Sequence, residues 1–226
     1  MNLSQKTAIV VGASHGLGKA VVELLVKERA NVFALARTIE DTDFPSSVHK
    51  VSVDVLNWKS IDSAFAAIDK EVAEIDILVN CAGRGLQKEF ESTSREEIAD
   101  ILRINLEGNI YTAQEAYKRM LPKNSGHIIN VSSTSGIKPR DMETIYCASK
   151  WGLRGFTESL RLAANPHKIR VTGVYPGGMH SENFWKIASG KDGNGYMDPT
   201  LIAEQIVNLL KTSPSISPSE LIIERS

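Results

Sequence analysis

Residues 7–18 read TAIVVGASHGLG, a short apolar run that ends in a glycine-rich turn. A run that is apolar at almost every position is typical of a strand covered on both faces, as in a parallel sheet. Glycines permit a tight turn and a close approach of backbone N–H groups to a phosphate, and the N-terminus of a following helix favours negative charge. The stretch therefore predicts a first strand, a nucleotide-binding loop and a helix, in that order.

The glycines of this loop are spaced Gly12-x3-Gly16-x-Gly18, which differs from the G-x-G-x-x-G dinucleotide fingerprint. A glycine turn alone is weak evidence, because an ordinary tight turn would look the same. Its position after the first strand of an alternating pattern favours a cofactor loop. The residues expected to bind the cofactor here are Gly12, Ser14, His15, Gly16, Leu17 and Gly18.

Strand-like and helix-like segments alternate along the rest of the chain. Further strands are expected over residues 31–36, 48–53, 75–80, 127–132, 169–175 and 220–225. Helices are expected over residues 60–74, 95–121, 146–164 and 200–211. Repeated strand–helix–strand units predict an α/β fold, a doubly wound parallel sheet with helices on both faces. We expect residues 1–226 to form a single Rossmann-type domain of about seven strands in the order 3-2-1-4-5-6-7.

The irregular stretch 177–199 contains five glycines. It follows the carboxyl end of the expected strand 169–175, the side on which open α/β sheets bind ligands. Loops of this length are usually functional or disordered. A substrate lid is therefore expected here, and a connection without function is the alternative.

Composition excludes several classes of protein. The chain has 226 residues, 42% hydrophobic and 23% charged, with a net charge of −1, so nothing suggests a nucleic-acid or anionic-membrane partner. No apolar run approaches the ~18 residues of a membrane span. Cys81 and Cys147 lack metal-ligand spacing, so we expect no metal site and two reduced thiols in a cytoplasmic protein.

Tyr146 and Lys150 are four residues apart and would share one face of a helix. A free phenol has a pKa of about 10 and is a poor base near neutrality, and a nearby cation lowers that pKa. Tyr146 could then donate a proton to a carbonyl oxygen as a hydride arrives, or accept one in reverse. Ser133, at the end of an expected strand, could hold the substrate oxygen near the phenol. Chance pairing of Tyr with Lys and an ordinary turn serine are the alternatives.

Several ordered motifs together resemble the classical short-chain dehydrogenase/reductase family over nearly the whole chain. Gly12-x3-Gly16-x-Gly18 resembles the family's cofactor loop, and Asn80-Cys81-Ala82-Gly83 resembles its Asn-Asn-Ala-Gly segment, with Cys81 in place of the second Asn. Asp54-Val55 is similar to the pair after the third strand that contacts adenine. Pro176-Gly177-Gly178-Met179-His180-Ser181 resembles the Pro-Gly segment after the sixth strand, where Ser181 keeps the hydroxyl of the family's usual Thr.

The resemblance implies a role for each matching residue. The implied catalytic set is Asn105, Ser133, Tyr146 and Lys150. Asn105 would kink the long helix and hold a water joined to the lysine, and Lys150 would also bind the ribose hydroxyls. Besides the loop, the implied cofactor contacts are Asp54, Val55, Asn80, Ala82, Gly83, Tyr146, Lys150, Pro176, Gly177, Met179 and Ser181.

The end of the second expected strand bears on cofactor choice. An acidic residue there favours a free 2′-hydroxyl, and a nearby Arg suits a 2′-phosphate. The strand ends with Ala36 and Arg37, so the sequence favours NADP(H), with NAD(H) possible and a solvated Arg37 as the alternative. In the resembling family a basic residue at this place marks an NADP(H)-preferring subgroup. That subgroup commonly has a second basic residue just before the second glycine of the loop, where this chain has the more weakly basic His15.

These features predict an oxidoreductase that transfers a hydride between NADP(H) and a carbonyl or alcohol substrate, with Tyr146 as acid/base. A 3-oxoacyl-thioester reductase is one alternative, and a non-catalytic NADP(H)-sensing regulatory protein is another. Leu86, Ile137, Met142, Met179, Phe184 and Trp185 could line an apolar substrate pocket or simply pack. The resemblance alone implies a homodimer or homotetramer.

Overall fold

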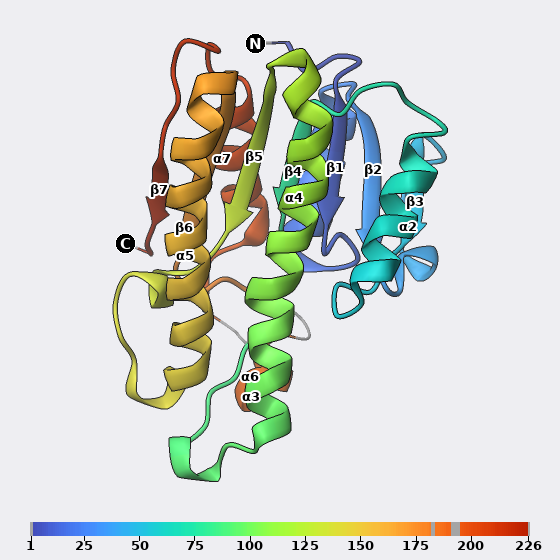
Figure 1. Cartoon of the computed structure of the whole chain (residues 1–226). Coiled ribbons are helices and arrows are strands. Elements are labelled where there is room, and N and C mark those ends of the chain that lie inside the picture. Colours follow the sequence, from blue (N-terminus) through green and yellow to red (C-terminus); the bar gives the residue numbers. More distant parts are fainter. Residues whose placement is uncertain (1, 182–183, 191–194, 226) are drawn as a thin grey trace.

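A seven-stranded parallel sheet forms the centre of the computed structural model, which describes residues 2–181, 184–190 and 195–225. The strands lie in the order β3-β2-β1-β4-β5-β6-β7, and every neighbouring pair is parallel. Both the predicted fold class and the predicted strand order are therefore confirmed (Figure 1).

The strands follow the apolar runs of the sequence closely. β1 and β2 have the predicted bounds, and the other strands differ from prediction by a few residues at their ends. Their bounds are β1 Thr7–Val11, β2 Asn31–Ala36, β3 Val48–Ser52, β4 Ile77–Asn80, β5 Gly126–Val131, β6 Ile169–Pro176 and β7 Glu220–Ile223. All residues of β1 and β6 are buried, because these strands lie inside the sheet with helices over both faces.

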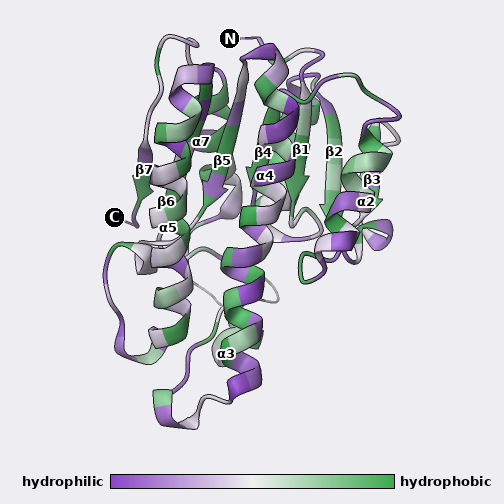
Figure 2. Cartoon of the chain, viewed as in Figure 1, coloured by the Kyte–Doolittle hydropathy of each residue, from purple (hydrophilic) through white to green (hydrophobic). Residues whose placement is uncertain are grey.

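Helices cover both faces of the sheet. They are α1 Gly16–Lys27, α2 Trp58–Ile68, α3 Arg95–Leu102, α4 Gly108–Met120, α5 Thr144–Ala164, α6 Phe184–Ser189 and α7 Pro199–Leu210. Alternate residues of each strand point to opposite faces, so Val10 packs with α1 and α7, and Val11 packs with α2 and α4. Figure 2 shows the hydrophobic strands between helices that carry both hydrophobic and hydrophilic residues.

Three predicted segments differ from the structure. The predicted helix 60–74 begins earlier, where Asn57 caps the Lys59 N–H, and it ends at Ile68. After Ile68, the Lys70 N–H donates to the Ala67 carbonyl and the Glu71 N–H donates to the Ile68 carbonyl, which is the i→i−3 pattern of a 3₁₀ turn. The predicted helix 95–121 is divided by a π-helical turn, Arg103–Glu107, between α3 and α4.

The third difference is in the stretch 177–199, which is more regular than predicted. It contains α6, and its two ends pair through hydrogen bonds from the His180 N–H to the Met197 carbonyl and from the Met197 N–H to the Gly178 carbonyl, at 2.7 and 3.1 Å. Residues 182, 183 and 191–194 of the predicted lid lie outside the described part. Within the described residues, no helix has both the length and the apolar character needed to cross a membrane.

Candidate active site

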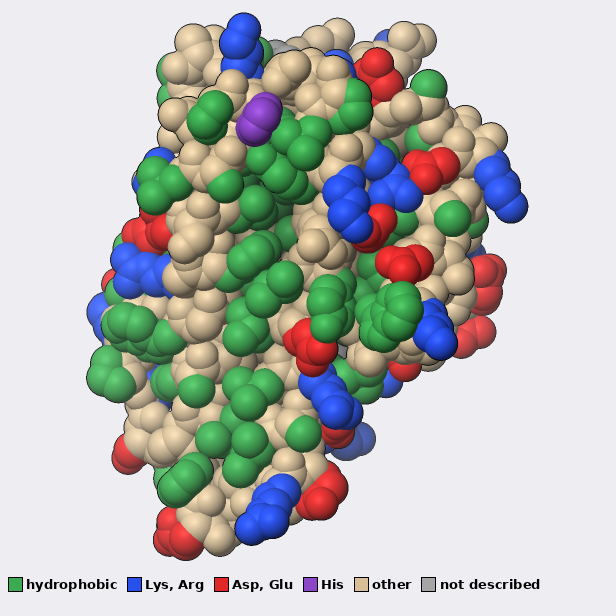
Figure 3. Space-filling view, viewed as in Figure 1, with side chains coloured by type: hydrophobic (Ala, Val, Ile, Leu, Met, Phe, Trp, Pro, Cys, Tyr) green, Lys and Arg blue, Asp and Glu red, His purple; other side chains and the backbone are tan. Residues whose placement is uncertain are grey.

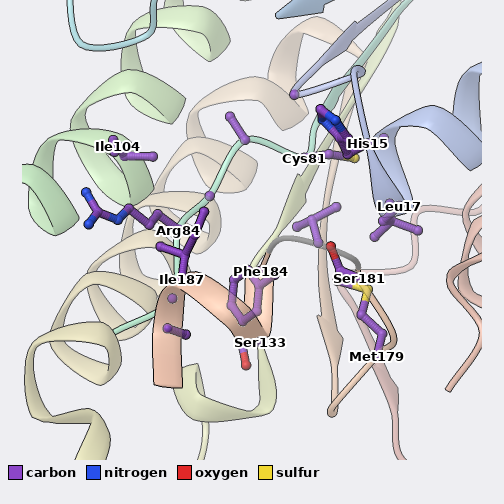
Figure 4. A pocket seen from close by; sticks show the side chains of 18 of the residues that line it. His15, Leu17, Cys81, Arg84, Ile104, Ser133, Met179, Ser181, Phe184 and Ile187 are labelled. Atoms are coloured by element: carbon purple, nitrogen blue, oxygen red, sulfur yellow. The ribbon is translucent and has the colours of Figure 1, made fainter. Parts of the chain in front are cut away.

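A cleft with a volume of about 570 Å³ crosses the carboxyl ends of the central strands. The segments that follow β1 to β6 all contribute to its walls, as expected for a ligand site in an open α/β sheet. In Figure 4, His15, Leu17 and Cys81 lie toward one end of the cleft, and Ser133, Phe184 and Ile187 lie toward the other. The two ends differ in chemistry.

The first end is formed by the glycine loop between β1 and α1. Gly12 has a φ of +79°, and a Cβ atom there would lie 2.7 Å from the Ala82 backbone nitrogen. A Cβ atom on Gly18 would overlap the Gly12 carbonyl. His15, at the N-cap of α1, makes no side-chain cap hydrogen bond, so the first N–H groups of the helix are left for an anionic ligand. All the predicted loop residues line the cleft: Gly12, Ser14, His15, Gly16, Leu17 and Gly18.

Residues that follow β2 and β3 extend this end of the cleft. Arg37 is exposed and lines the cleft beside Ala36 and Thr38. Asp54 and Val55 line it from the end of β3. The positive charge of Arg37 therefore lies where the predicted contact with a 2′-phosphate would be. The neighbouring position that could carry an acidic residue for a free 2′-hydroxyl is Ala36.

Asn80 lies behind the cleft, in contrast to Ala82 and Gly83, which line it. The Asn80 amide donates to the Asn130 Oδ1 and to the Asn109 carbonyl, at 3.0 and 3.2 Å, and its own Oδ1 accepts from the Thr112 hydroxyl at 2.8 Å. These contacts tie β4 to β5 and α4. The structure thus gives Asn80 a supporting place in the sheet, and its predicted contact with a cofactor stays a prediction.

Tyr146, Ser133 and Lys150 come together at the second end of the cleft, and all three line it. Tyr146 and Lys150 lie one turn apart on α5, with the Lys150 Nζ 5.8 Å from the centre of the Tyr146 ring. The Lys150 ammonium donates to the Val131 carbonyl at 3.2 Å. Ser133 precedes the turn Thr134–Gly136 and lies within hydrogen-bonding reach of the phenol.

Burial governs the ionisation of both residues on α5. Burial raises the pKa of Tyr146, and a hydrogen bond with the Ser133 side chain opposes this effect. Burial lowers the pKa of Lys150 to about 8, so the ammonium is largely charged at neutral pH. The predicted lowering of the phenol pKa by Lys150 stays a prediction.

Asn105 is buried in the π-helical turn, one residue beyond Ile104, which lines the cleft. Its Oδ1 accepts from the Arg84 N–H at 2.7 Å, and its amide donates to the Arg84 carbonyl and to the Ser149 hydroxyl, at 2.9 and 3.0 Å. The Ser149 hydroxyl donates in turn to the Tyr146 carbonyl at 2.7 Å. Asn105 therefore joins the loop after β4 to the helix that carries the phenol.

The segment after β6 closes the cleft from the opposite side. The predicted contacts Pro176, Gly177, Met179 and Ser181 all line it. A Cβ atom on Gly16 would lie 3.1 Å from the Ser181 Oγ, which places this hydroxyl against the glycine loop. On α6, Phe184 meets the Tyr146 ring edge to face, with ring centres 6.1 Å apart. Of the six apolar residues suggested for a substrate pocket, Leu86, Met179, Phe184 and Trp185 line the cleft, and Ile137 and Met142 do not.

The sequence analysis missed several polar residues of the cleft, among them Ser135, Arg140 and Glu143. Glu143 precedes Tyr146 by three residues, and this spacing was the one available signal, because residues three apart share a helix face. No sequence signal pointed to Ser135 or Arg140. Among the described residues, no three His, Cys, Asp or Glu side chains gather as a metal ion would require.

Comparison with known proteins identifies the family. The family model described as short chain dehydrogenase matches residues 6–192. The chain belongs to the short-chain dehydrogenase family. The predicted resemblance is thereby confirmed, and the protein is an oxidoreductase of this family.

Relatives of this short-chain dehydrogenase span most of its length. An uncharacterised oxidoreductase of Staphylococcus aureus is 29% identical over 98% of this chain and 97% of its own. A 3-oxoacyl-[acyl-carrier-protein] reductase of Bos taurus is 32% identical over 78% of this chain and 77% of its own.

Solved structures resemble the whole fold of this short-chain dehydrogenase. A serine dehydrogenase complexed with NADP+ has a TM-score of 0.90 at 26% identity, covering 96% of this chain and 94% of its own. An actinorhodin polyketide ketoreductase with NADPH has a TM-score of 0.85 at 25% identity, covering 97% of this chain and 95% of its own.

Proposed function

We propose that the protein is an NADP(H)-dependent carbonyl reductase, with Tyr146 as the acid/base. The observation that carries the proposal is the layout of the cleft: a phenol, a hydroxyl and an ammonium group lie at one end, and a glycine loop with a nearby arginine lies at the other. A dinucleotide that extends along the cleft would bring its reactive ring to the phenol. The NADP+ and NADPH in the related structures support this choice of cofactor.

The residues present fit such a cofactor. Gly12 and Gly18 leave no space for side chains, so a pyrophosphate can approach the backbone N–H groups at the start of α1. Lys150 lies near enough to the phenol to serve both it and a ribose hydroxyl. When bound, the nicotinamide supplies the hydride.

The protein's own residues then handle orientation and the proton. Ser133 would hold the substrate oxygen beside the phenol, and Tyr146 would protonate that oxygen as the carbon is reduced. The positive charge of Lys150 stabilises the phenolate that results. Phe184 and Trp185 cover this end of the cleft and keep water from it.

The direct test is consumption of NADPH with a panel of aldehydes, ketones, quinones and 3-oxoacyl thioesters, with NADH alongside. We expect turnover with NADPH on at least one carbonyl class. Tight NADPH binding without turnover on any member would instead favour the regulatory NADP(H) sensor. Turnover restricted to 3-oxoacyl thioesters would favour the second enzymatic candidate, which the bovine acyl-carrier-protein reductase supports.

Arg37→Ala is expected to raise the KM for NADPH by about 10- to 100-fold, since a charge-assisted hydrogen bond to a phosphate is lost. The KM for NADH should stay within about twofold, because NADH has no 2′-phosphate. Steady-state kinetics with both cofactors measure the effect. Arg95→Ala, which removes an exposed arginine outside the cleft, is the control. Equal losses with both cofactors would contradict a 2′-phosphate contact.

We also propose that the protein pairs with a second copy through α4 and α5, as a homodimer or within a homotetramer. Hydrophobic side chains gather in a band over these helices in Figure 3. On α5, Trp151 and Leu162 are 45% and 66% exposed, and exposed apolar patches of this kind mark sites of interaction with other proteins. A second copy packed on this face would remove them from water.

A further inference from the structure

Glu143 occupies the N-cap position of α5 but does not cap the helix. The side chains that ordinarily cap a helix from this position are the shorter ones of Ser, Thr, Asp and Asn. Here the Glu143 Oε2 accepts from the Ser135 hydroxyl at 2.7 Å, and no side-chain cap hydrogen bond is made. The Glu143 side chain is only 13% exposed, so its charge is largely removed from water. A carboxylate turned away from its helix and held in a cleft calls for another explanation.

The contact at Ser135 leads directly to the proposed catalytic group. The Ser135 N–H donates to the Ser133 Oγ at 3.1 Å, and the Ser133 side chain lies within hydrogen-bonding reach of the Tyr146 phenol. Ser135 is 3% exposed, so its hydroxyl has little access to water as an alternative partner. Glu143 therefore anchors the turn that directly follows Ser133, the residue whose side chain faces the phenol.

The charge of Glu143 also acts on the phenol. The groups that face Tyr146 are Glu143 at the N-cap of α5, Cys147 on α5, Arg140 before them, and Lys150 one helical turn on, with Cys81 beside Lys150. Glu143 and Cys147 raise the pKa of Tyr146 further after burial, and Arg140 lowers it. Arg140 compensates Glu143 only partly, because the two side chains are 3.9 Å apart and Arg140 is half-exposed.

We infer that Glu143 is a positioning residue of this site, which fixes Ser133 through Ser135 and adds its charge to the burial that keeps the Tyr146 phenol in its neutral, proton-donating form. This inference rests on the proposed carbonyl reduction. A neighbouring negative charge disfavours the phenolate. Since reduction requires a protonated phenol and alcohol oxidation a deprotonated one, Glu143 favours reduction at neutral and moderately alkaline pH.

Four variants separate the charge from the hydrogen bond. Glu143→Gln keeps an oxygen that can accept from Ser135 but removes the charge, and Ser135→Ala removes the donor but keeps the charge. Glu143→Ala removes both. Asp141→Asn is the matched control, because it neutralises an exposed carboxylate two residues away that does not line the cleft.

Two measurements are made on each variant. The first is the pH dependence of kcat and KM for carbonyl reduction. The second is the ultraviolet titration of the phenolate, taken as the difference from the Tyr146→Phe protein, with and without NADP+. The titration needs no turnover, so it decides the inference even if the proposed substrate class is wrong.

We expect the phenolate of Glu143→Gln to form at lower pH than in the unaltered protein, by roughly half a pH unit, with kcat falling earlier on the alkaline side and KM unchanged. Ser135→Ala should lower kcat about fivefold without moving the titration to lower pH, and Glu143→Ala should show both effects. Asp141→Asn should match the unaltered protein. An unmoved titration in Glu143→Gln overturns the inference. A raised KM with unchanged pH dependence also overturns it, because Glu143 would then contact the substrate.

Discussion

Tyr146→Phe is expected to lower kcat for carbonyl reduction by about 10²- to 10⁴-fold, the usual contribution of a positioned proton donor. The substitution removes one oxygen from a buried ring and leaves the ring in place. Its edge-to-face contact with Phe184 and the nearby Lys150 ammonium are both kept. NADPH affinity should therefore change by less than about threefold, and only the proton-transfer step should suffer.

Steady-state kinetics and equilibrium binding of NADPH together test this result. Tyr111→Phe is the control, because Tyr111 lies on α4 outside the lining of the cleft and its hydroxyl donates to the Glu107 carboxylate. That control should keep full activity. If Tyr146→Phe retained most of kcat, another group would have to supply the proton, and the proposed mechanism would be wrong.

Much of the sheet could be predicted from the sequence because buried parallel strands leave a strong local signal. β1 and β2 are almost entirely apolar, and each is followed directly by a residue of another kind, Gly12 and Arg37. Their bounds were therefore predicted correctly. The Tyr146–Lys150 spacing on α5 likewise depends only on helix geometry. The meeting of Ser133 with this pair follows from the parallel sheet, since β5 ends next to the start of α5.

Features that depend on contacts between distant segments leave no local pattern in the sequence. The residues 95–121 themselves do not indicate the π-helical turn, because the contact of Asn105 with Arg84 joins positions 21 residues apart, and only the family resemblance implied a kink at Asn105. The packing of α6 against the loop after β4 is a second example: a Cβ atom on Gly85 would lie 2.6 Å from the Ala188 Cβ. Such contacts are created by the tertiary fold and leave no periodic pattern.

Glu143 was missed for a related reason. A glutamate before a helix ordinarily lies in water. Only the structure shows that its carboxylate turns to Ser135 in a different loop. The residues that hold a site together are thus harder to find than those that react, because their partners are distant in sequence.

Gly12→Ala is expected to lower NADPH affinity by about 10- to 100-fold, because strain of about 1–3 kcal/mol must be relieved by moving the loop. The φ of +79° is unfavourable for alanine, and the new Cβ would lie 2.7 Å from the Ala82 nitrogen and 2.8 Å from its Cα. Both atoms belong to the backbone of the segment after β4, so no flexible side chain can give way. The loop N–H groups would shift away from the phosphates they are proposed to bind. Equilibrium binding of NADPH and the melting temperature measure the two consequences.

Gly155→Ala is the matched control, since it makes the same chemical change where nothing lies within 4 Å of the new Cβ. Gly155 lies inside α5, where alanine is favoured over glycine by roughly 0.5–1 kcal/mol, so its melting temperature should rise slightly with NADPH affinity unchanged. Gly12→Ala should therefore lower both the melting temperature and the NADPH affinity, whereas Gly155→Ala should raise the melting temperature slightly and leave the affinity unchanged. If Gly12→Ala bound NADPH as tightly as Gly155→Ala, the loop backbone would not be what holds the cofactor. Arg37 and Lys150 would then have to carry most of the affinity, which a fall in binding with rising salt concentration would reveal.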